Sequence, residues 1–255
     1  MPRRLWTDDE MILALDLYFK LPFGRLNSTT PEVMELATLI GRTNNSVALR
    51  LVNYAACDPY IISSGRTGMT SGIDKCMPYW NRYANHKDEL FLDAELIKSR
   101  LKNQSIDKLL ALSSEDFVGK EREYVIRQRV NQSAFRSMIL ANYNQQCAIS
   151  GLCLPQLLVA SHIIPWADNE NERLNPENGI CLSPLYDKAF DKGYIGVRSD
   201  YSIMISKELK EYKHMDFYKN FFDIIENQKI NLPEEHIPNI AFLEYHLKNI
   251  FSKHN

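Results

Sequence analysis

The 255-residue chain contains no long apolar run, and this absence excludes a large class of proteins. A helix that crosses a membrane needs roughly 18 or more consecutive apolar residues, and the sequence has no such stretch. The first six residues also lack the apolar core of a secretory signal peptide. We therefore expect a cytoplasmic protein that does not associate with a membrane.

The chain also has little cysteine and little net charge. Its five cysteines are odd in number and irregularly spaced, which is not the pattern of a secreted disulfide framework. Reduced thiols in a cytosol are the simpler interpretation. A formal net charge of −2 does not by itself indicate a nucleic-acid-binding protein, although a balanced total can conceal a local basic face. Internal repeats and low-complexity tracts are absent as well.

The chain does contain enough apolar residues to form a sizeable buried core. Hydrophobic residues make up 45% of the chain and charged residues 24%, which is ordinary for a globular protein. The length suits one large domain or two modest ones. We predict an α+β protein, with a helical domain over residues 1–100 and a second domain over residues 101–255.

The N-terminal segment is predicted to form three helices. Thr7 and Glu10 have the spacing of a capping box, which starts a helix. A second helix is expected over residues 31–40, ending at Gly41, and a third over about 45–54. A helix, a short glycine-containing turn and a second helix are typical of the helix-turn-helix motif.

In such a motif the start of the second helix enters the DNA major groove. The side chains that it would present here are those of Arg42, Asn44, Asn45, Ser46 and Arg50. Arginine and asparagine suit base edges and phosphates alike. A plain helical bundle with a polar surface helix fits the same pattern, so both interpretations stay open at this point.

The middle of the chain is less specific. Residues 58–81 contain clustered serine, glycine and threonine, which predict an exposed loop or linker. Helical patterns follow and continue past Leu112, and a basic-rich helix is expected over residues 120–143. Arg129 and Arg136 lie in that helix and are candidates for phosphate contact, although a solvated face is the alternative.

After residue 146 the pattern changes to short strands and turns. An apolar run predicts a strand that ends near His162, and a polar loop leads to a second strand opened by Asn178. Ser183 then starts a short helix that carries Asp187, so the predicted order is strand, loop, strand, helix. The tail is predicted to add strands at 194–197, 201–205 and near Ile230, and helices around 217–222 and 240–251.

Three polar residues stand at this strand–helix junction. A neutral histidine such as His162 can take a proton from water near pH 7. The carboxylate of Asp187 suits a hard cation such as Mg²⁺, and Asn178, beside a glycine, can bridge loop backbones. Each residue type is also common in purely structural places, so the individual positions do not decide between these roles.

Taken together, these segments resemble the HNH endonuclease motif. The resemblance rests on two runs, ASHIIPW over Ala160–Trp166 and NGICLSPLYDKAFDKG over Asn178–Gly193, with a matching lead-in over residues 129–151. It is closest to the bacterial restriction-like branch. The resemblance implies a ββα-metal nuclease core at about 147–197, with an α/β C-terminal extension, that cuts duplex DNA with one Mg²⁺ or Mn²⁺ ion per active site.

The resemblance also implies roles for single residues. His162 takes the place of the general base, Asn178 that of the residue that holds the loop, and Asp187 that of a metal ligand. Many HNH proteins carry an aspartate just before the histidine, where this chain has Ser161. A structural zinc site is not expected, because of the four cysteines that bind zinc in some relatives only Cys147 is kept.

The expected function is therefore a restriction or defence endonuclease, acting as a homodimer so that both DNA strands are cut. Two alternatives stay open. The first is a DNA-binding regulator with an inert HNH domain, which the missing aspartate before His162 would favour. The second is a nonspecific DNase or RNase, which is usually a small and strongly basic unit without a recognition domain.

Overall fold

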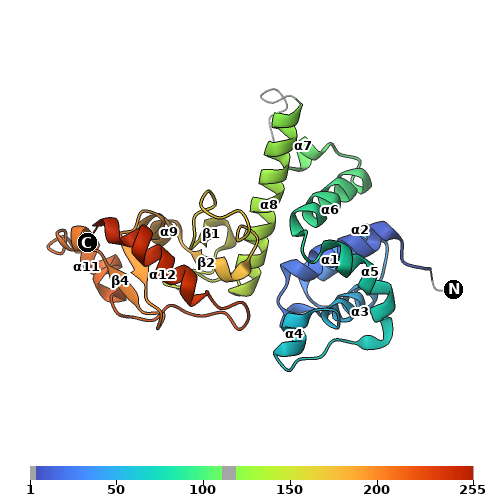
Figure 1. Ribbon diagram of the computed structural model, residues 1–255, viewed down its shortest axis with the longest axis horizontal. Helices are drawn as coiled ribbons and strands as arrows, with labels where there is room; N and C mark the ends of the chain where they lie inside the picture. The colour runs from blue at the N-terminus through green and yellow to red at the C-terminus, as the bar shows by residue number, and fades with distance from the viewer. Residues whose placement is uncertain (1–3, 111–118, 255) are drawn as a thin grey trace. The chain divides into compact units, whose positions relative to one another are not determined.

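A computed structural model describes residues 4–110 and 119–254 of the chain (Figure 1). It consists of two compact units, residues 1–134 (unit 1) and residues 135–255 (unit 2). None of the helices in the described ranges combines the length and apolarity that a membrane crossing requires. The predicted helical pattern past Leu112 runs into residues outside the described ranges.

Unit 1 is helical in the part that the structure describes. Its elements are α1 (Asp8–Lys20), η1 (Phe23–Arg25), α2 (Pro31–Ile40), α3 (Asn44–Ala55), α4 (Pro59–Ser63), η2 (Thr70–Gly72), α5 (Ile73–Tyr83), α6 (Lys87–Leu101), α7 (Ile106–Leu109) and the first part of α8 (Lys120–Asn142). Helix α1 packs against α2, α3, α5 and α6, and so lies at the centre of the unit (Figure 1).

The first three helices are confirmed, and local chemistry explains their ends. Thr7 accepts a hydrogen bond from the Glu10 amide while the Glu10 side chain accepts one from the Thr7 amide, which is a full capping box. Gly41 ends α2 in the left-handed conformation, at φ 65°. Thr43 then caps α3 through the Ser46 amide.

The predicted loop over residues 58–81 is wrong in two places. Asp58 caps the short helix α4, and α5 already begins at Ile73 with Pro78 inside it. The segment between them, residues 64–72, is mostly exposed, as predicted, but it makes a close contact with α3. A Cβ on Gly68 would lie 2.2 Å from the Ala56 nitrogen, so this glycine permits a close approach to α3 that its sequence context does not reveal.

Unit 2 combines helices with two small antiparallel sheets. Its elements are the end of α8, η3 (Pro155–Leu157), β1 (Val159–His162), η4 (Pro176–Asn178), β2 (Gly179–Leu182), α9 (Pro184–Asp191), β3 (Ile195–Val197), β4 (Ile203–Ile205), α10 (Lys207–Lys210), α11 (Asp216–Phe221), η5 (Asp223–Ile225), α12 (Ile240–Asn249) and η6 (Phe251–His254).

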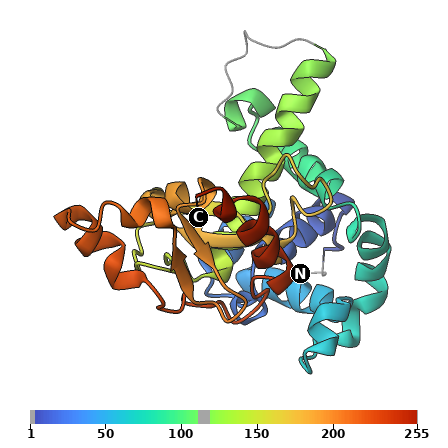
Figure 2. The same ribbon diagram turned by 60° about the vertical axis from the view of Figure 1, so that its left-hand side comes forward.

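The predicted order of strand, loop, strand and helix is confirmed. Strands β1 and β2 pair antiparallel, with His162 opposite Gly179 at the end nearest the loop, and α9 packs back on β1. The predicted tail strands form the β3–β4 pair, against which α12 lies (Figure 2). The strand expected near Ile230 is wrong, because only an isolated bridge between Ser202 and Lys229 forms there.

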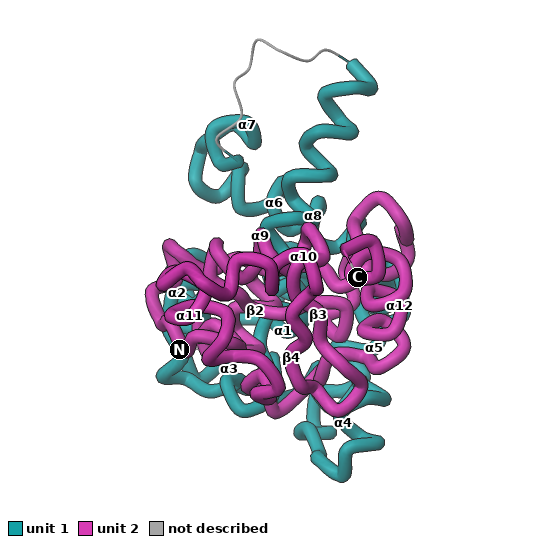
Figure 3. Tube along the Cα trace, turned by 90° about the vertical axis from the view of Figure 1, so that its left-hand side faces the viewer, with its two compact units in different colours: residues 1–134 teal, residues 135–255 magenta. Residues whose placement is uncertain are grey.

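The division between the units falls inside α8, between Ala134 and Phe135 (Figure 3). The sequence places the boundary instead between residues 100 and 101. A continuous helix contains no turn residue or linker composition at the point where its contacts change from one unit to the other. For that reason the actual division has no sequence signal.

Candidate active site

His162 ends strand β1 and is half-buried. Its Nε2 lies 3.1 Å from the backbone oxygen of Arg173. A carbonyl oxygen can only accept, so Nε2 carries the proton and Nδ1 is the basic nitrogen of the neutral ring. Nδ1 has no hydrogen-bond partner among the described residues, and it is not sealed from solvent. The tertiary contact thus leaves one nitrogen available as a proton acceptor.

The imidazole ring is held on both sides by aromatic residues. Phe135 of α8 stacks on it at 3.7 Å between ring centroids, and Trp166 meets it edge-on at 5.4 Å. Gly179, opposite His162 on β2, leaves room for this arrangement, because a Cβ there would lie 2.7 Å from Cζ of Phe135 and 2.3 Å from Cδ1 of Ile139. The glycine therefore serves close packing beneath the histidine.

Burial controls the ionisation of His162. Burial is the largest cause and lowers the pKa of the ring, the hydrogen bond to the Arg173 carbonyl acts to raise it, the Arg173 charge acts to lower it, and the net value is about 4. The imidazole is consequently neutral at physiological pH. A neutral ring with Nδ1 open can accept a proton.

Arg173 owes its own position to contacts within the loop. Its Nε donates to the Trp166 carbonyl at 2.8 Å, and its guanidinium lies 5.1 Å from the centre of the Trp166 ring. These contacts fix the backbone oxygen that orients His162. The role of Arg173 is absent from the sequence-based prediction, because a backbone carbonyl is common to every residue and leaves no mark in the sequence.

Asn178 is 1% exposed and braces the loop between β1 and β2. Its Oδ1 accepts from the Ile164 amide at 2.8 Å, and its Nδ2 donates to the carbonyls of Ile164 (3.3 Å) and Glu172 (3.1 Å). Its backbone oxygen also accepts from the Ile163 amide at 2.9 Å. The residue therefore joins the chain just after His162 to the chain just before Arg173.

Asp187 lies in the first turn of α9, where its carboxylate meets β1. Burial raises its pKa, a hydrogen bond with Ser161 lowers it, and the nearby charge of Asp191 raises it. Ser161 directly precedes His162, so the carboxylate of Asp187 reaches the same end of β1 as the histidine. Ser161 thus contacts an aspartate that lies on α9.

This donor set fits a cation that keeps most of its water. Within the described ranges, no three His, Cys, Asp or Glu side chains gather as a metal site. The half-buried carboxylate of Asp187, with one hydroxyl beside it, is a hard oxygen donor. It suits Mg²⁺ or Mn²⁺ held by one protein carboxylate, by water and by substrate phosphate, rather than an all-protein cage.

Cys147 lies at the start of the same core, at the position where some HNH proteins bind zinc. Its buried Sγ accepts from the amides of Ser150 (3.3 Å) and Ser183 (3.1 Å). Tyr186 donates its hydroxyl proton to the carbonyl of Phe221 at 2.8 Å. The thiol and the tyrosine thus cross-link the turns through hydrogen bonds, and the predicted lack of structural zinc stays a prediction.

Several residues predicted to bind DNA have other partners. Arg42 pairs with Glu10 at 2.7 Å, donates to the Leu5 carbonyl and stacks on Trp6. Arg136 of α8 donates to the carbonyls of Leu158 and Pro155, and so anchors the entry to β1. Both guanidiniums are engaged within their own units.

The other residues predicted to bind DNA differ in how exposed they are. Asn44 and Ser46 are partly exposed and Asn45 is exposed, all at the start of α3, whereas Arg50 is buried. Arg42, Asn45, Ser46 and Arg50 border one pocket in unit 1. Arg129 lies exposed on α8, outside that pocket. The structure therefore separates the predicted set into surface positions, internal anchors and one buried arginine.

Residues 147–198 match the family model HNH_2, described as HNH endonuclease. The match covers β1, β2 and α9 with His162, Asn178 and Asp187, and it supports an HNH endonuclease domain in this part of the chain. No curated protein matches the chain significantly.

Proposed function

With an HNH endonuclease domain over residues 147–198 as the premise, we propose that this protein is a metal-dependent DNA endonuclease. The observation that carries the proposal is the orientation of His162, whose Nε2 donates to the Arg173 carbonyl while Nδ1 stays open, at the end of β1 where Ser161 bonds Asp187. We assign the enzyme to restriction or defence, with duplex DNA as substrate and unit 1 as the recognition domain.

In this reaction water attacks the phosphorus and the bond to the 3′ oxygen breaks. Nδ1 of His162 takes the proton of the attacking water. Nε2 keeps its own proton and its bond to the Arg173 carbonyl, which stabilises the positive charge on the ring. A ring with a lowered pKa is a weak base, but the approach of the anionic phosphate favours its protonated form and strengthens it.

Asn178 acts as a positioning residue. It ties the backbone on both sides of the loop, so the Arg173 carbonyl and the His162 ring keep their relative orientation. Asp187 would hold the metal ion, with Ser161 as the neighbour that orients the carboxylate. A divalent cation bound there supplies neutralisation of the phosphate charge and stabilisation of the leaving oxygen.

Plasmid cleavage tests the proposal directly. Wild type, His162→Ala and His214→Ala are incubated with unmodified and modified plasmid in Mg²⁺, Mn²⁺ or EDTA. His214 is an exposed histidine of unit 2 and serves as the matched control. We expect metal-dependent cutting by wild type and His214→Ala, and a loss of about 10²–10⁴-fold or more in His162→Ala. Equal cutting by all three proteins would refute the role of His162.

Two further measurements define the finer assignments. Discrete fragments from unmodified or modified DNA support a restriction role, and comparison with single strands and RNA tests the preference for duplex DNA. We also propose a homodimer, because two active sites are needed to cut both strands in one encounter. Sedimentation of the protein, alone and with a short duplex, measures the oligomeric state.

A further inference from the structure

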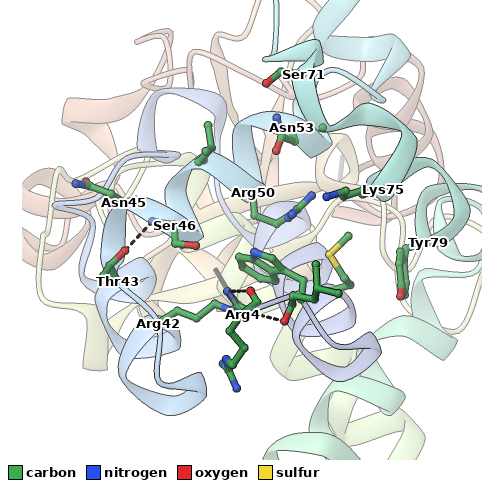
Figure 4. Close-up of a pocket in the computed structure, with 15 residues that line it drawn as sticks. Arg4, Arg42, Thr43, Asn45, Ser46, Arg50, Asn53, Ser71, Lys75 and Tyr79 are labelled. Atoms are coloured by element: carbon green, nitrogen blue, oxygen red, sulfur yellow. Dashed lines mark hydrogen bonds between the residues drawn. The ribbon is translucent and has the colours of Figure 1, made fainter. Parts of the chain in front are cut away.

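Unit 1 contains a pocket of about 850 Å³ that the cleavage reaction does not use. It lies among the segment before α1, the start of α3 and the α5 region (Figure 4). Its volume is within the range of sites that hold small organic molecules, about 300–1,000 Å³. The charged side chains that border it are those of Arg4, Arg42, Arg50 and Lys75.

Arg50 is a buried charge for which the described part of the chain provides no counter-charge. The residue is 8% exposed, its guanidinium lies 4.8 Å from the centre of the Trp6 ring, and Nη1 donates only to the Cys76 sulfur at 3.5 Å. Nε has no hydrogen-bond partner. Among residues 4–110 and 119–254, no carboxylate forms an ion pair with Arg50.

The other groups around Arg50 do not neutralise it. Burial raises the pKa of the Cys76 thiol, although Arg50 itself acts to lower it. Burial and Asp8 together raise the pKa of Tyr79 to about 12, and burial likewise raises the pKa of Tyr54. All three neighbours are therefore protonated and neutral near pH 7.

A second positive group reaches the same space. Figure 4 shows the side-chain ends of Arg50 and Lys75 pointing toward one another across the pocket. Two like charges that converge without a carboxylate between them repel each other, and burying an unpaired charge is costly. A bound anion between the two ends would remove both penalties.

Arg42, on the wall of the same pocket, provides the internal comparison. Its charge has a structural partner, because it pairs with Glu10, a carboxylate that it shares with Arg4. No carboxylate of the described residues forms such a pair with Arg50. This difference indicates that the partner of Arg50 comes from outside the chain.

We propose that this pocket binds a phosphate ester of a nucleotide, held by Arg50 from within and by Lys75 from the exposed rim. Guanidinium groups match phosphate oxygens through paired hydrogen bonds, and lysine adds a point charge. Asn45 and Ser46, at the start of α3, offer polar groups for the rest of the nucleotide. The phosphate can come from the DNA backbone or from a free nucleotide, so the inference deepens the recognition role proposed for unit 1.

Calorimetric titration of the full chain tests the site. The probes are a 5′-mononucleotide, the corresponding nucleoside without phosphate, and a short DNA duplex in EDTA. We expect wild type to bind the mononucleotide, the duplex or both, and not the nucleoside. Arg50→Met and Lys75→Ala should each weaken binding about tenfold or more, because each removes a charge-assisted contact. Lys102→Ala, an exposed lysine at the end of α6, is the matched control and should bind as wild type.

The outcomes separate the phosphate sources and the two proposals. Binding of the mononucleotide alone identifies a free nucleotide as the source of the phosphate, and binding of the duplex alone identifies the DNA backbone.

Arg50→Met should keep or raise the melting temperature, because it removes an unpaired buried charge. If this variant fails to fold, the affinity of Lys75→Ala decides. Absence of phosphate-dependent binding, or wild-type affinity in Lys75→Ala, overturns the site. His162→Ala should bind the phosphate probes as wild type does but should not cut plasmid DNA. A failure of the pocket proposal can therefore be distinguished from a failure of the nuclease proposal.

Discussion

His162 and His246 occupy nearly identical local settings in unit 2, and yet they differ in what they can do. Each ring stacks on a phenylalanine, Phe135 at 3.7 Å for His162 and Phe190 at 3.8 Å for His246. Each Nε2 bonds a backbone carbonyl, at 3.1 and 2.9 Å respectively. Burial is the main cause that lowers the pKa of each to about 4.

The difference lies in access to the second nitrogen. Nδ1 of His246 is sealed inside the unit with no hydrogen-bond partner, and the residue is 1% exposed. His162 is only half-buried at the end of β1, and its Nδ1 stays open. Stacking, a carbonyl partner and a lowered pKa are therefore not sufficient signs of a catalytic histidine. Access of Nδ1 to water is what separates the two.

The largest effect is expected when the two histidines are exchanged for glutamine in turn. His162→Gln should lower the rate of plasmid cleavage by about 10²–10⁴-fold, because it removes the proton acceptor. His246→Gln should change the cleavage rate little and instead lower the melting temperature, because it alters a fully buried contact with Phe190. Initial rates and thermal unfolding on the same preparations measure both. Equal loss of rate in the two variants would remove the distinction.

The next effect concerns two aspartates of α9. Asp187 contacts Ser161 beside the open histidine, whereas the charge of Asp191 acts on the sealed His246. We expect Asp187→Asn to raise the Mg²⁺ concentration for half-maximal cleavage about tenfold or more, because an amide is a poorer cation ligand than a carboxylate. Asp191→Asn removes only a neighbouring charge and no proposed ligand, so it should shift the requirement less than Asp187→Asn does. A shift confined to Asp191→Asn would reverse the assignment.

A smaller effect on rate and a clear effect on stability are expected at Asn178. Asn178→Ala leaves the buried Ile164 amide and carbonyl without partners and removes one of the two donors to the Glu172 carbonyl, which should cost about 2–4 kcal/mol in the free energy of unfolding. Asn178→Asp keeps the acceptor for the Ile164 amide and should recover part of the loss. Urea unfolding monitors stability, and cleavage rates at a temperature where all variants are folded report positioning. Unchanged stability in Asn178→Ala would contradict the bracing role.

The last effect concerns stability and not the cleavage rate, and it is the acid sensitivity that the two histidines share. Their folded pKa is about 4, against 6.5 for a free ring, so the unfolded chain binds protons first. This contribution to stability is complete above pH 6.5 and is lost as the pH falls toward 4, by up to about 1.4 kcal/mol per pH unit for each ring. His246→Phe should remove one ring's share. Urea unfolding of wild type and variant between pH 7 and 4.5 measures the difference in slope.

Much of the fold is predictable because its signals are local. The capping box at Thr7, the glycine end of α2 and the strand–loop–strand–helix order around His162 depend on residues close together in the sequence. The prediction over residues 58–81 is wrong at α4 and α5, because the serine, glycine and threonine residues around them favour a loop. Within the loop that does form, the close approach of Gly68 to α3 depends on tertiary packing and not on the local pattern.

By itself, the sequence determined the identity of the chemical groups: a histidine, an asparagine and an aspartate in the spacing of an HNH motif. Only the tertiary structure decided which nitrogen of His162 is open, since that depends on a carbonyl eleven residues away. It also decided that Arg42 pairs with an internal carboxylate and that Arg50 pairs with none of those within residues 4–110 and 119–254. Residue type sets what a side chain can bind, whereas burial and the partners that folding brings to it determine which of those interactions remains available.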